Sequence, residues 1–162
     1  MAREGRATGA DRTVHRVGIA DFAVDGDGAV LSTSGLGSCL GVGLYDESTG
    51  VAGLAHVMLP DAPAEPSNPA KYTDSGIAVL LEAMRTEGAN VESVRAKLAG
   101  GSAMFGFDSQ EHPIGERNVA TARTVLERRE IPIVAEDVGG DSGRSVRFHG
   151  ATGELVVMSA SA

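Results

Sequence analysis

Cys39 is the only cysteine in this chain of 162 residues, and His56 follows it seventeen residues later. A free thiol with a pKa of about 8.5 is only a few per cent thiolate at neutral pH, so it is a weak nucleophile by itself. An imidazole beside the sulfur can take up the proton, and an imidazolium there would hold the thiol pKa below its free value. The pair therefore predicts a nucleophile with its base. The alternative for Cys39 is a small buried apolar residue without chemistry.

Two apolar segments would place these side chains on neighbouring strands. Alternation over residues 39–45 and again over 51–58 predicts two strands, and the polar stretch 46–50 predicts the turn between them. The expected hairpin is antiparallel, with Asp46 opposite Val51.

This register puts Gly41 opposite His56 and leaves Cys39 one diagonal away on the same face, at roughly 7–8 Å between Cα atoms. Gly41 and Gly43 carry no side chains, so the imidazole could lean across the strand toward the sulfur. A slip of one residue would move His56 to the other face and break the pair.

The residues before Cys39 could supply an oxyanion site. Residues 35–38 are Gly-Leu-Gly-Ser, a flexible backbone whose N–H groups near Gly37 and Ser38 could converge on the negative oxygen that acyl transfer develops. A plain tight turn before the strand is the open alternative.

The elements before the hairpin bring the site together from sequence-local pieces. We expect a flexible arm over residues 1–14 and a single domain over 15–162, with a first strand over 16–24, a turn over 25–28 and a second strand over 29–33 leading into the cysteine loop.

The remaining elements follow from apolar periodicity and turn residues. Four prolines between positions 60 and 69 predict an extended loop that could form a substrate rim. A helix around Ile77–Met84 is capped by Asp74 or Ser75 and ended by Gly88. Beyond it we expect a strand over 91–98, a loop over 100–102 whose amides either face the site or form a plain turn, a helix beginning near 115–118, and strands over 131–136, 145–149 and 154–158.

Two main helices and about seven strands indicate an α/β (α+β) domain in which the helices pack on a mixed, largely antiparallel sheet system.

Composition excludes several function classes. A net charge of −8 opposes nucleic-acid binding, because phosphates would be repelled. One cysteine permits no internal disulfide, and the scattered histidines have no metal-ligand spacing, so we expect no metal and no cofactor. The sequence has no apolar span of membrane length and no signal peptide, which predicts a cytoplasmic protein without membrane insertion.

Six motifs follow one another along nearly the whole chain: Leu36-Gly37-Ser38-Cys39, residues 53–60, Lys71-Tyr72-Thr73-Asp74, residues 96–101, residues 114–118, and Asp137-Val138-Gly139-Gly140 followed by Gly143-Arg144. In this order they resemble the CheD family of chemoreceptor glutamine deamidases. The resemblance implies a CheD-like cysteine hydrolase fold and conversion of receptor glutamine side chains to glutamate.

The resemblance also implies site residues. Cys39 and His56 stand at the nucleophile and base positions, and the family's third triad member, a hydroxyl residue, falls on Thr33, with Ser32 and Ser34 as alternatives. Thr33 would accept the imidazole N–H and fix its tautomer. A strand threonine bonded to backbone is the alternative reading.

Partners follow from the same resemblance: the helical bundle of a chemoreceptor's cytoplasmic part as substrate, and a CheC-type chemotaxis phosphatase as regulator. Two other functions stay open, a non-catalytic regulator of that phosphatase and a cysteine amidase with another substrate. Neither Arg117 nor Asn118 receives a catalytic step. Arg117 is expected to pair with a surface acid, with a receptor contact as the alternative, and Asn118 to cap a helix.

Overall fold

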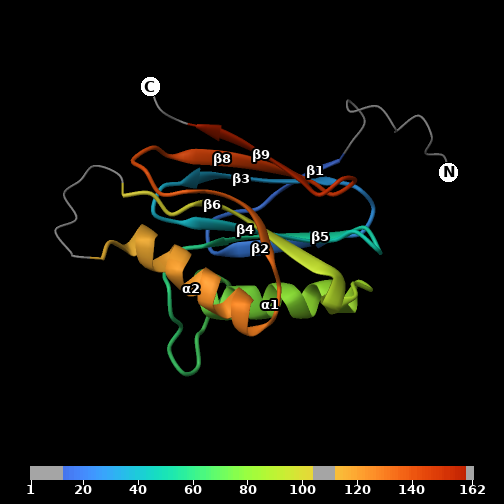
Figure 1. Ribbon diagram of the computed structural model, residues 1–162, viewed down its shortest axis with the longest axis horizontal. Coiled ribbons are helices and arrows are strands. Elements are labelled where there is room, and N and C mark those ends of the chain that lie inside the picture. The colour runs from blue at the N-terminus through green and yellow to red at the C-terminus, as the bar shows by residue number, and fades with distance from the viewer. Residues whose placement is uncertain (1–12, 104–111, 160–162) are drawn as a thin grey trace.

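Two β-sheets and a pair of helices form three layers in the computed structural model, which describes residues 13–103 and 112–159 (Figure 1). Most of the arm expected over residues 1–14 lies outside the described residues. The four-stranded sheet has the order β1 (Val14–Arg16), β3 (Val30–Leu36), β8 (Arg144–His149), β9 (Glu154–Ser159). The five-stranded sheet has the order β2 (Asp21–Asp25), β5 (Val51–Val57), β4 (Leu40–Asp46), β6 (Val94–Gly100), β7 (Ile133–Val138).

The helices α1 (Thr73–Thr86) and α2 (Ile114–Arg128) cover the outer face of the five-stranded sheet (Figure 1). Among the strand pairs of the described residues, only β1–β3 and β6–β7 are parallel, which confirms the expected mixed, largely antiparallel α+β architecture. Neither described helix has the length and apolar composition needed to cross a membrane.

Two apolar cores separate the layers. Ile77, Leu80 and Met84 of α1 are fully buried against the five-stranded sheet. A Cβ atom on Gly53 of β5 would lie 2.7 Å from Leu80 Cδ1, so the glycine lets the helix approach the strand. The second core, between the sheets, contains Leu54 and Phe148. The site described below opens from this second core.

The strand expected over residues 16–24 is wrong, because the chain crosses between the sheets there. β1 lies in one sheet and β2 in the other. Between them Val17 turns into the inter-sheet core, and Ala20 adopts a left-handed φ of 62°, which ends strand geometry. The Ala20 amide then donates to His56 O at 2.9 Å, on the second sheet.

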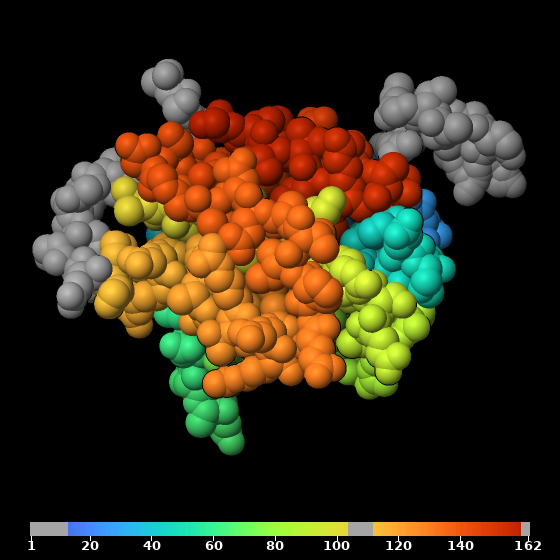
Figure 2. Space-filling view, in the orientation of Figure 1, coloured from blue at the N-terminus to red at the C-terminus, as the bar shows by residue number. Residues whose placement is uncertain are grey.

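Two other boundaries differ for local reasons. Residues Val91–Ser93, expected in a strand, form a 3₁₀ turn because the Asn90 side chain caps the Glu92 amide. The cap of α1 is Tyr72, which makes no side-chain capping bond. Asp74, the predicted cap, instead accepts from the Ala62 amide at 3.0 Å and so holds the proline-rich loop. Figure 2 shows this loop, residues 60–69, projecting from the body of the molecule.

Candidate active site

The hairpin register predicted from the sequence is confirmed. Asp46 pairs with Val51 and Gly41 pairs with His56 in the antiparallel β4–β5 ladder. His56 is fully buried, on the face of β5 that meets the four-stranded sheet. Cys39 is half-buried in the bend that joins β3 to β4, and it packs against the same inter-sheet core. It directly precedes Leu40, the residue of β4 that pairs with Val57, and its sulfur makes no hydrogen bond with His56 Nε2.

Thr33 contacts the imidazole across the two sheets. Its Oγ1 lies 2.7 Å from His56 Nδ1 and donates to Val17 O at 2.7 Å. The hydroxyl has one proton, which goes to the Val17 carbonyl, so the hydroxyl oxygen must accept from Nδ1–H. His56 is therefore the tautomer with a free lone pair on Nε2.

His56 Nε2 is buried and has no hydrogen-bond partner among residues 13–103 and 112–159. Buried polar atoms are normally paired, so an unpaired one needs a reason. An unpaired imidazole lone pair is an available proton acceptor.

Ser32 and Ser34 do not share this position. Side chains alternate along a strand, so Ser32 lies on the opposite face of β3 from Thr33, and Ser34, which lies where the β3–β8 register shifts, is exposed. Of the three adjacent hydroxyl residues, Thr33 is the one that contacts His56.

The titration behaviour corrects one sequence expectation. Burial raises the pKa of the Cys39 thiol, and burial lowers the pKa of His56 to about 4. The expectation that an imidazolium holds the pKa of the Cys39 thiol below its free value is therefore wrong. Both groups rest in their neutral forms at neutral pH, because desolvation disfavours charge on either one.

The two glycines of β4 make room for the facing sheet rather than for the imidazole alone. A Cβ atom on Gly41 would lie 3.3 Å from Leu36 Cδ1, and one on Gly43 would lie 3.1 Å from the Phe148 ring. Leu36 and Phe148 therefore fill the space above Gly41 and Gly43 that we expected the imidazole of His56 to occupy. The glycines let the two sheets, and with them Thr33 and His56, come close.

The loop over residues 100–102 holds the cysteine loop by its carbonyl groups. The Gly101 amide donates to Cys39 O at 2.8 Å, and the Ser102 amide and hydroxyl donate to Gly37 O at 2.8 and 2.9 Å. The amides that were expected either to face the site or to form a plain turn thus bind the backbone of the site. A Cβ atom on Gly100, whose φ is +110°, would lie 2.5 Å from Cys39 O, so this approach requires glycine.

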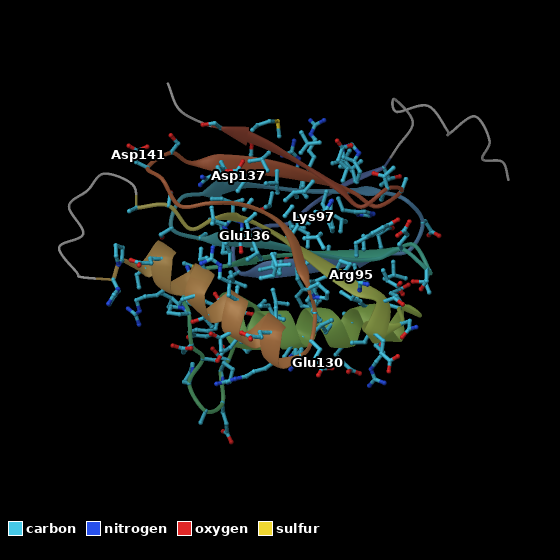
Figure 3. All side chains as sticks on the ribbon, in the orientation of Figure 1. Arg95, Lys97, Glu130, Glu136, Asp137 and Asp141 are labelled. Atoms are coloured by element: carbon cyan, nitrogen blue, oxygen red, sulfur yellow. The ribbon has the colours of Figure 1, made fainter. Side chains whose placement is uncertain are left out.

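Arg144 helps to hold the loop over residues 100–102 through contacts with the end of β7. Asp137 of β7, labelled in Figure 3, accepts from Arg144 Nε at 3.1 Å. Arg144 Nη2 donates to Gly139 O at 2.9 Å, and the Gly139 amide donates to Gly100 O at 3.0 Å. These contacts connect the end of β7 to the loop that carries Ser102.

Asn118 is a polar residue of this region whose contacts the sequence did not reveal. It is fully buried in α2, and its Nδ2 donates to Ser38 O at 2.9 Å and to Met58 O at 3.0 Å. The predicted capping role is wrong, since the cap of α2 is Pro113. A usable signal was its position on the apolar stripe with Val119 and Ala122, where a buried amide must have partners.

The amide groups of the cysteine loop divide into two kinds. The Gly37 amide donates to Gly35 O at 3.0 Å, so it is occupied by the bend. The amides of Ser38 and Cys39 have no acceptor within the described part of the chain. Ser38 and Cys39 are therefore the available donors for an oxyanion, and Gly37 is not.

The exposed Arg117 forms no ion pair with any acid of the described residues, so the surface pairing expected for it stays a prediction.

Comparisons with known proteins identify the family of this chain. The model of the protein family described as CheD chemotactic sensory transduction matches residues 58–159. A Haloarcula marismortui protein named a probable chemoreceptor glutamine deamidase CheD is 48% identical over 90% of this chain and 84% of its own. A Halalkalibacterium halodurans protein named chemoreceptor glutamine deamidase CheD is 44% identical over 89% of this chain and 92% of its own.

The alignment with the Haloarcula protein leaves a tenth of this chain unmatched, so the alignment spans the stretch from Thr33 to His56. Among solved structures, a Neisseria meningitidis protein of the DUF152 family has a similar fold, with a TM-score of 0.53 and 16% identity. It covers 81% of this chain, and this chain covers 65% of it, less than two thirds.

Proposed function

Because the chain belongs to the CheD family, we propose that it deamidates glutamine side chains of chemoreceptors, with Cys39, His56 and Thr33 as its catalytic triad. The observation that carries the proposal is the hydrogen bond between Thr33 Oγ1 and His56 Nδ1, which leaves Nε2 without a partner among the described residues, on the hairpin that directly follows Cys39. The fold alone would not support it, since one fold serves many activities.

The reaction begins with attack of Cys39 Sγ on the side-chain carbonyl carbon of glutamine, while His56 Nε2 takes the thiol proton. The carbon–nitrogen bond then breaks, and His56 returns the proton to the leaving nitrogen, which departs as ammonia. A thioester between Cys39 and the former glutamine side chain remains.

Water completes the cycle. His56 Nε2 takes a proton from the water as its oxygen attacks the thioester carbon, and the carbon–sulfur bond breaks to release glutamate. The proton returns to Cys39 Sγ, so one imidazole acts as base and acid in turn. Both half-reactions put negative charge on the carbonyl oxygen, which the free amides of Ser38 and Cys39 would stabilise.

The neutral resting forms of Cys39 and His56 suit these reaction steps. Burial raises the pKa of Cys39 and lowers that of His56 to about 4, so the proton moves from sulfur to nitrogen as the sulfur bonds to carbon. His56 remains an unprotonated base throughout the neutral range. Thr33 fixes the tautomer but adds no charge, unlike the carboxylate of a serine protease triad.

We also propose two features of its setting. The substrate would be an exposed helix face of the receptor's helical bundle, and a CheC-type phosphatase would compete for the same surface, with the family resemblance as support for both. The enzyme would act in the cytoplasm, where thiols such as that of Cys39 are kept reduced.

The test is ammonia release from a chemoreceptor cytoplasmic fragment, with mass spectrometry to locate each glutamine converted to glutamate. The wild-type protein should release ammonia, and Cys39→Ala should lower the rate at least about 10³-fold while its circular dichroism spectrum is unchanged. Equal release by Cys39→Ala would disprove the thioester route. A wild-type protein that binds a CheC-type phosphatase but releases no ammonia would be a regulator instead.

A further inference from the structure

Three successive carbonyl groups of the cysteine loop are each held by a hydrogen bond. Gly37 O accepts from Ser102, Ser38 O accepts from Asn118, and Cys39 O accepts from Gly101. The donors come from the loop after β6 and from α2, two segments whose backbones touch. A Cβ atom on Gly115 would lie 2.4 Å from Ser102 O. All three carbonyls are therefore held from one side of the loop.

The direction of each of these carbonyl groups determines the direction of the amide group that follows it. A trans peptide is planar, and its N–H points opposite to its C=O. The carbonyl of Gly37 shares a peptide unit with the amide of Ser38, and the carbonyl of Ser38 shares one with the amide of Cys39. A bond that fixes either carbonyl toward β6 and α2 fixes the following N–H away from them.

We infer that Ser102 and Asn118 are positioning residues that aim the Ser38 and Cys39 amides at the substrate oxyanion. This inference rests on the acyl-transfer chemistry proposed above. Neither side chain touches the substrate; each acts through one peptide plane. A donor on the carbonyl also polarises the peptide, which strengthens the N–H as a donor.

Both residues are buried for this purpose. Ser102 is 1% exposed and Asn118 is fully buried. Asn118 Nδ2 donates to both Ser38 O and Met58 O, and its Oδ1 lies 3.2 Å from Thr73 Oγ1, whose single proton is shared with Leu59 O at 3.0 Å. Met58 lies two residues after His56, so a single amide ties the nucleophile loop to the strand that carries the base.

Two reactions of Cys39 separate an oxyanion effect from a general effect on the thiol. Acylation by p-nitrophenyl acetate passes through a tetrahedral oxyanion, whereas alkylation by iodoacetamide displaces iodide and forms no oxyanion. The ratio of the two rates, measured on the full chain with mass spectrometry at Cys39, reports the oxyanion donors. Neither reagent requires a receptor fragment.

Asn118→Ala should lower this ratio about 10-fold or more, while the alkylation rate stays within about twofold of wild type. Ser102→Ala should lower it less, because the Ser102 backbone amide still holds Gly37 O. Thr73→Val is the matched control: it removes the hydroxyl that contacts Asn118 Oδ1 and Leu59 O, and it removes no bond to the cysteine loop. Its ratio should equal that of wild type.

An unchanged ratio in both Asn118→Ala and Ser102→Ala would overturn the inference, as would an equal fall in Thr73→Val. If Asn118→Ala does not fold, Ser102→Ala, which leaves the backbone bonds in place, decides the question alone. Wild-type protein that acylates no faster than Cys39→Ala would refute the acyl-transfer proposal itself and the inference with it. The two failures are distinguishable, because in the first the wild-type protein is acylated at Cys39 and the variants are acylated equally fast.

Discussion

In the proposed mechanism each residue of the Thr33–His56–Cys39 group has one role, and the roles differ in their effect on the rate. His56 would move a proton in every step, whereas Thr33 would only orient the ring and fix its tautomer through the 2.7 Å contact with Nδ1. A neutral hydroxyl cannot stabilise an imidazolium as a carboxylate does.

We therefore expect His56→Ala to lower kcat for deamidation about 10³-fold or more, and Thr33→Val to lower it only about 10- to 100-fold. Thr33→Ser, which keeps the hydroxyl, should stay within a few-fold of wild type. The measurement is ammonia release at saturating receptor fragment. Wild-type activity in Thr33→Val would remove Thr33 from the triad.

A second prediction at this scale concerns pH. The base must be neutral, and burial lowers the pKa of His56 to about 4, so kcat/KM should stay level down to about pH 5 and fall with a midpoint near 4. Since burial also raises the pKa of Cys39, iodoacetamide should alkylate it slowly at pH 7 compared with a free thiol. A limb near pH 6.5, or fast alkylation at neutral pH, would mean that the imidazole is charged in the free enzyme.

The sequence predicted the hairpin that carries His56, because a short turn and an apolar alternation determine its register. It did not predict the contacts of Ser102 and Asn118. Their partners in the cysteine loop lie 65 and 80 positions away along the chain, and no local pattern encodes such a contact.

At the scale of elements, the turn of the catalytic hairpin is held by one buried carboxylate. Asp46 accepts from the Ser48 amide and hydroxyl, from the Thr49 hydroxyl at 2.7 Å and from the Asn90 amide at 2.7 Å. Burial raises the pKa of Asp46, but these hydrogen bonds outweigh it and the net pKa is lowered.

Asp46→Ala should therefore lower the free energy of unfolding by roughly 3 kcal/mol, because buried donors lose a charged acceptor. Asp46→Asn, which keeps the shape but not the charge, should cost less. Urea titrations followed by circular dichroism give both values. A loss under about 0.5 kcal/mol, the range of ordinary surface substitutions, would show that the turn holds without this carboxylate.

Element types were predictable where the apolar period was long. Both helices and the β4–β5 hairpin carry such periods. The stretch 16–24 reads as one strand because apolar spacing cannot show that Val17 faces one core while Phe22 packs against another. The change of sheet depends on backbone geometry at Ala20, which no side-chain pattern reports.

For the whole molecule, His56 links the site to global stability. Its pKa is about 4 when folded against an ordinary value of 6.5, so between these pH values the unfolded chain binds more protons at this residue. Stability from this source is complete above pH 6.5 and is lost as pH falls toward 4, by up to about 3 kcal/mol.

The check is the free energy of urea unfolding at pH 7, 5.5 and 4.5, for wild type and for His56→Gln. Wild type should lose stability over this range, and the variant should lose less because it has no proton to bind at position 56. Parallel curves would show that His56 does not control the pH dependence. Asp46 does not interfere, since its lowered pKa places its titration below 3.8.

The order of the strands could not be derived from the sequence. β3 pairs with β8 although Thr33 and Val146 are more than a hundred residues apart in the sequence. The two sheets pack against each other through individual side chains from several strands. Pairing of distant strands depends on the whole core rather than on any local signal.

The Thr33–His56 contact joins one sheet to the other, and the bend with Cys39 is a point where the chain passes between them. The proposed triad therefore spans the boundary between the two sheets, and its geometry exists only while the sheets are packed against each other. Each sheet can keep its own ladder of backbone bonds when this packing is lost. In a slow denaturation the chemistry should vanish before the strands do, which makes catalysis a more sensitive gauge of interlayer docking than circular dichroism.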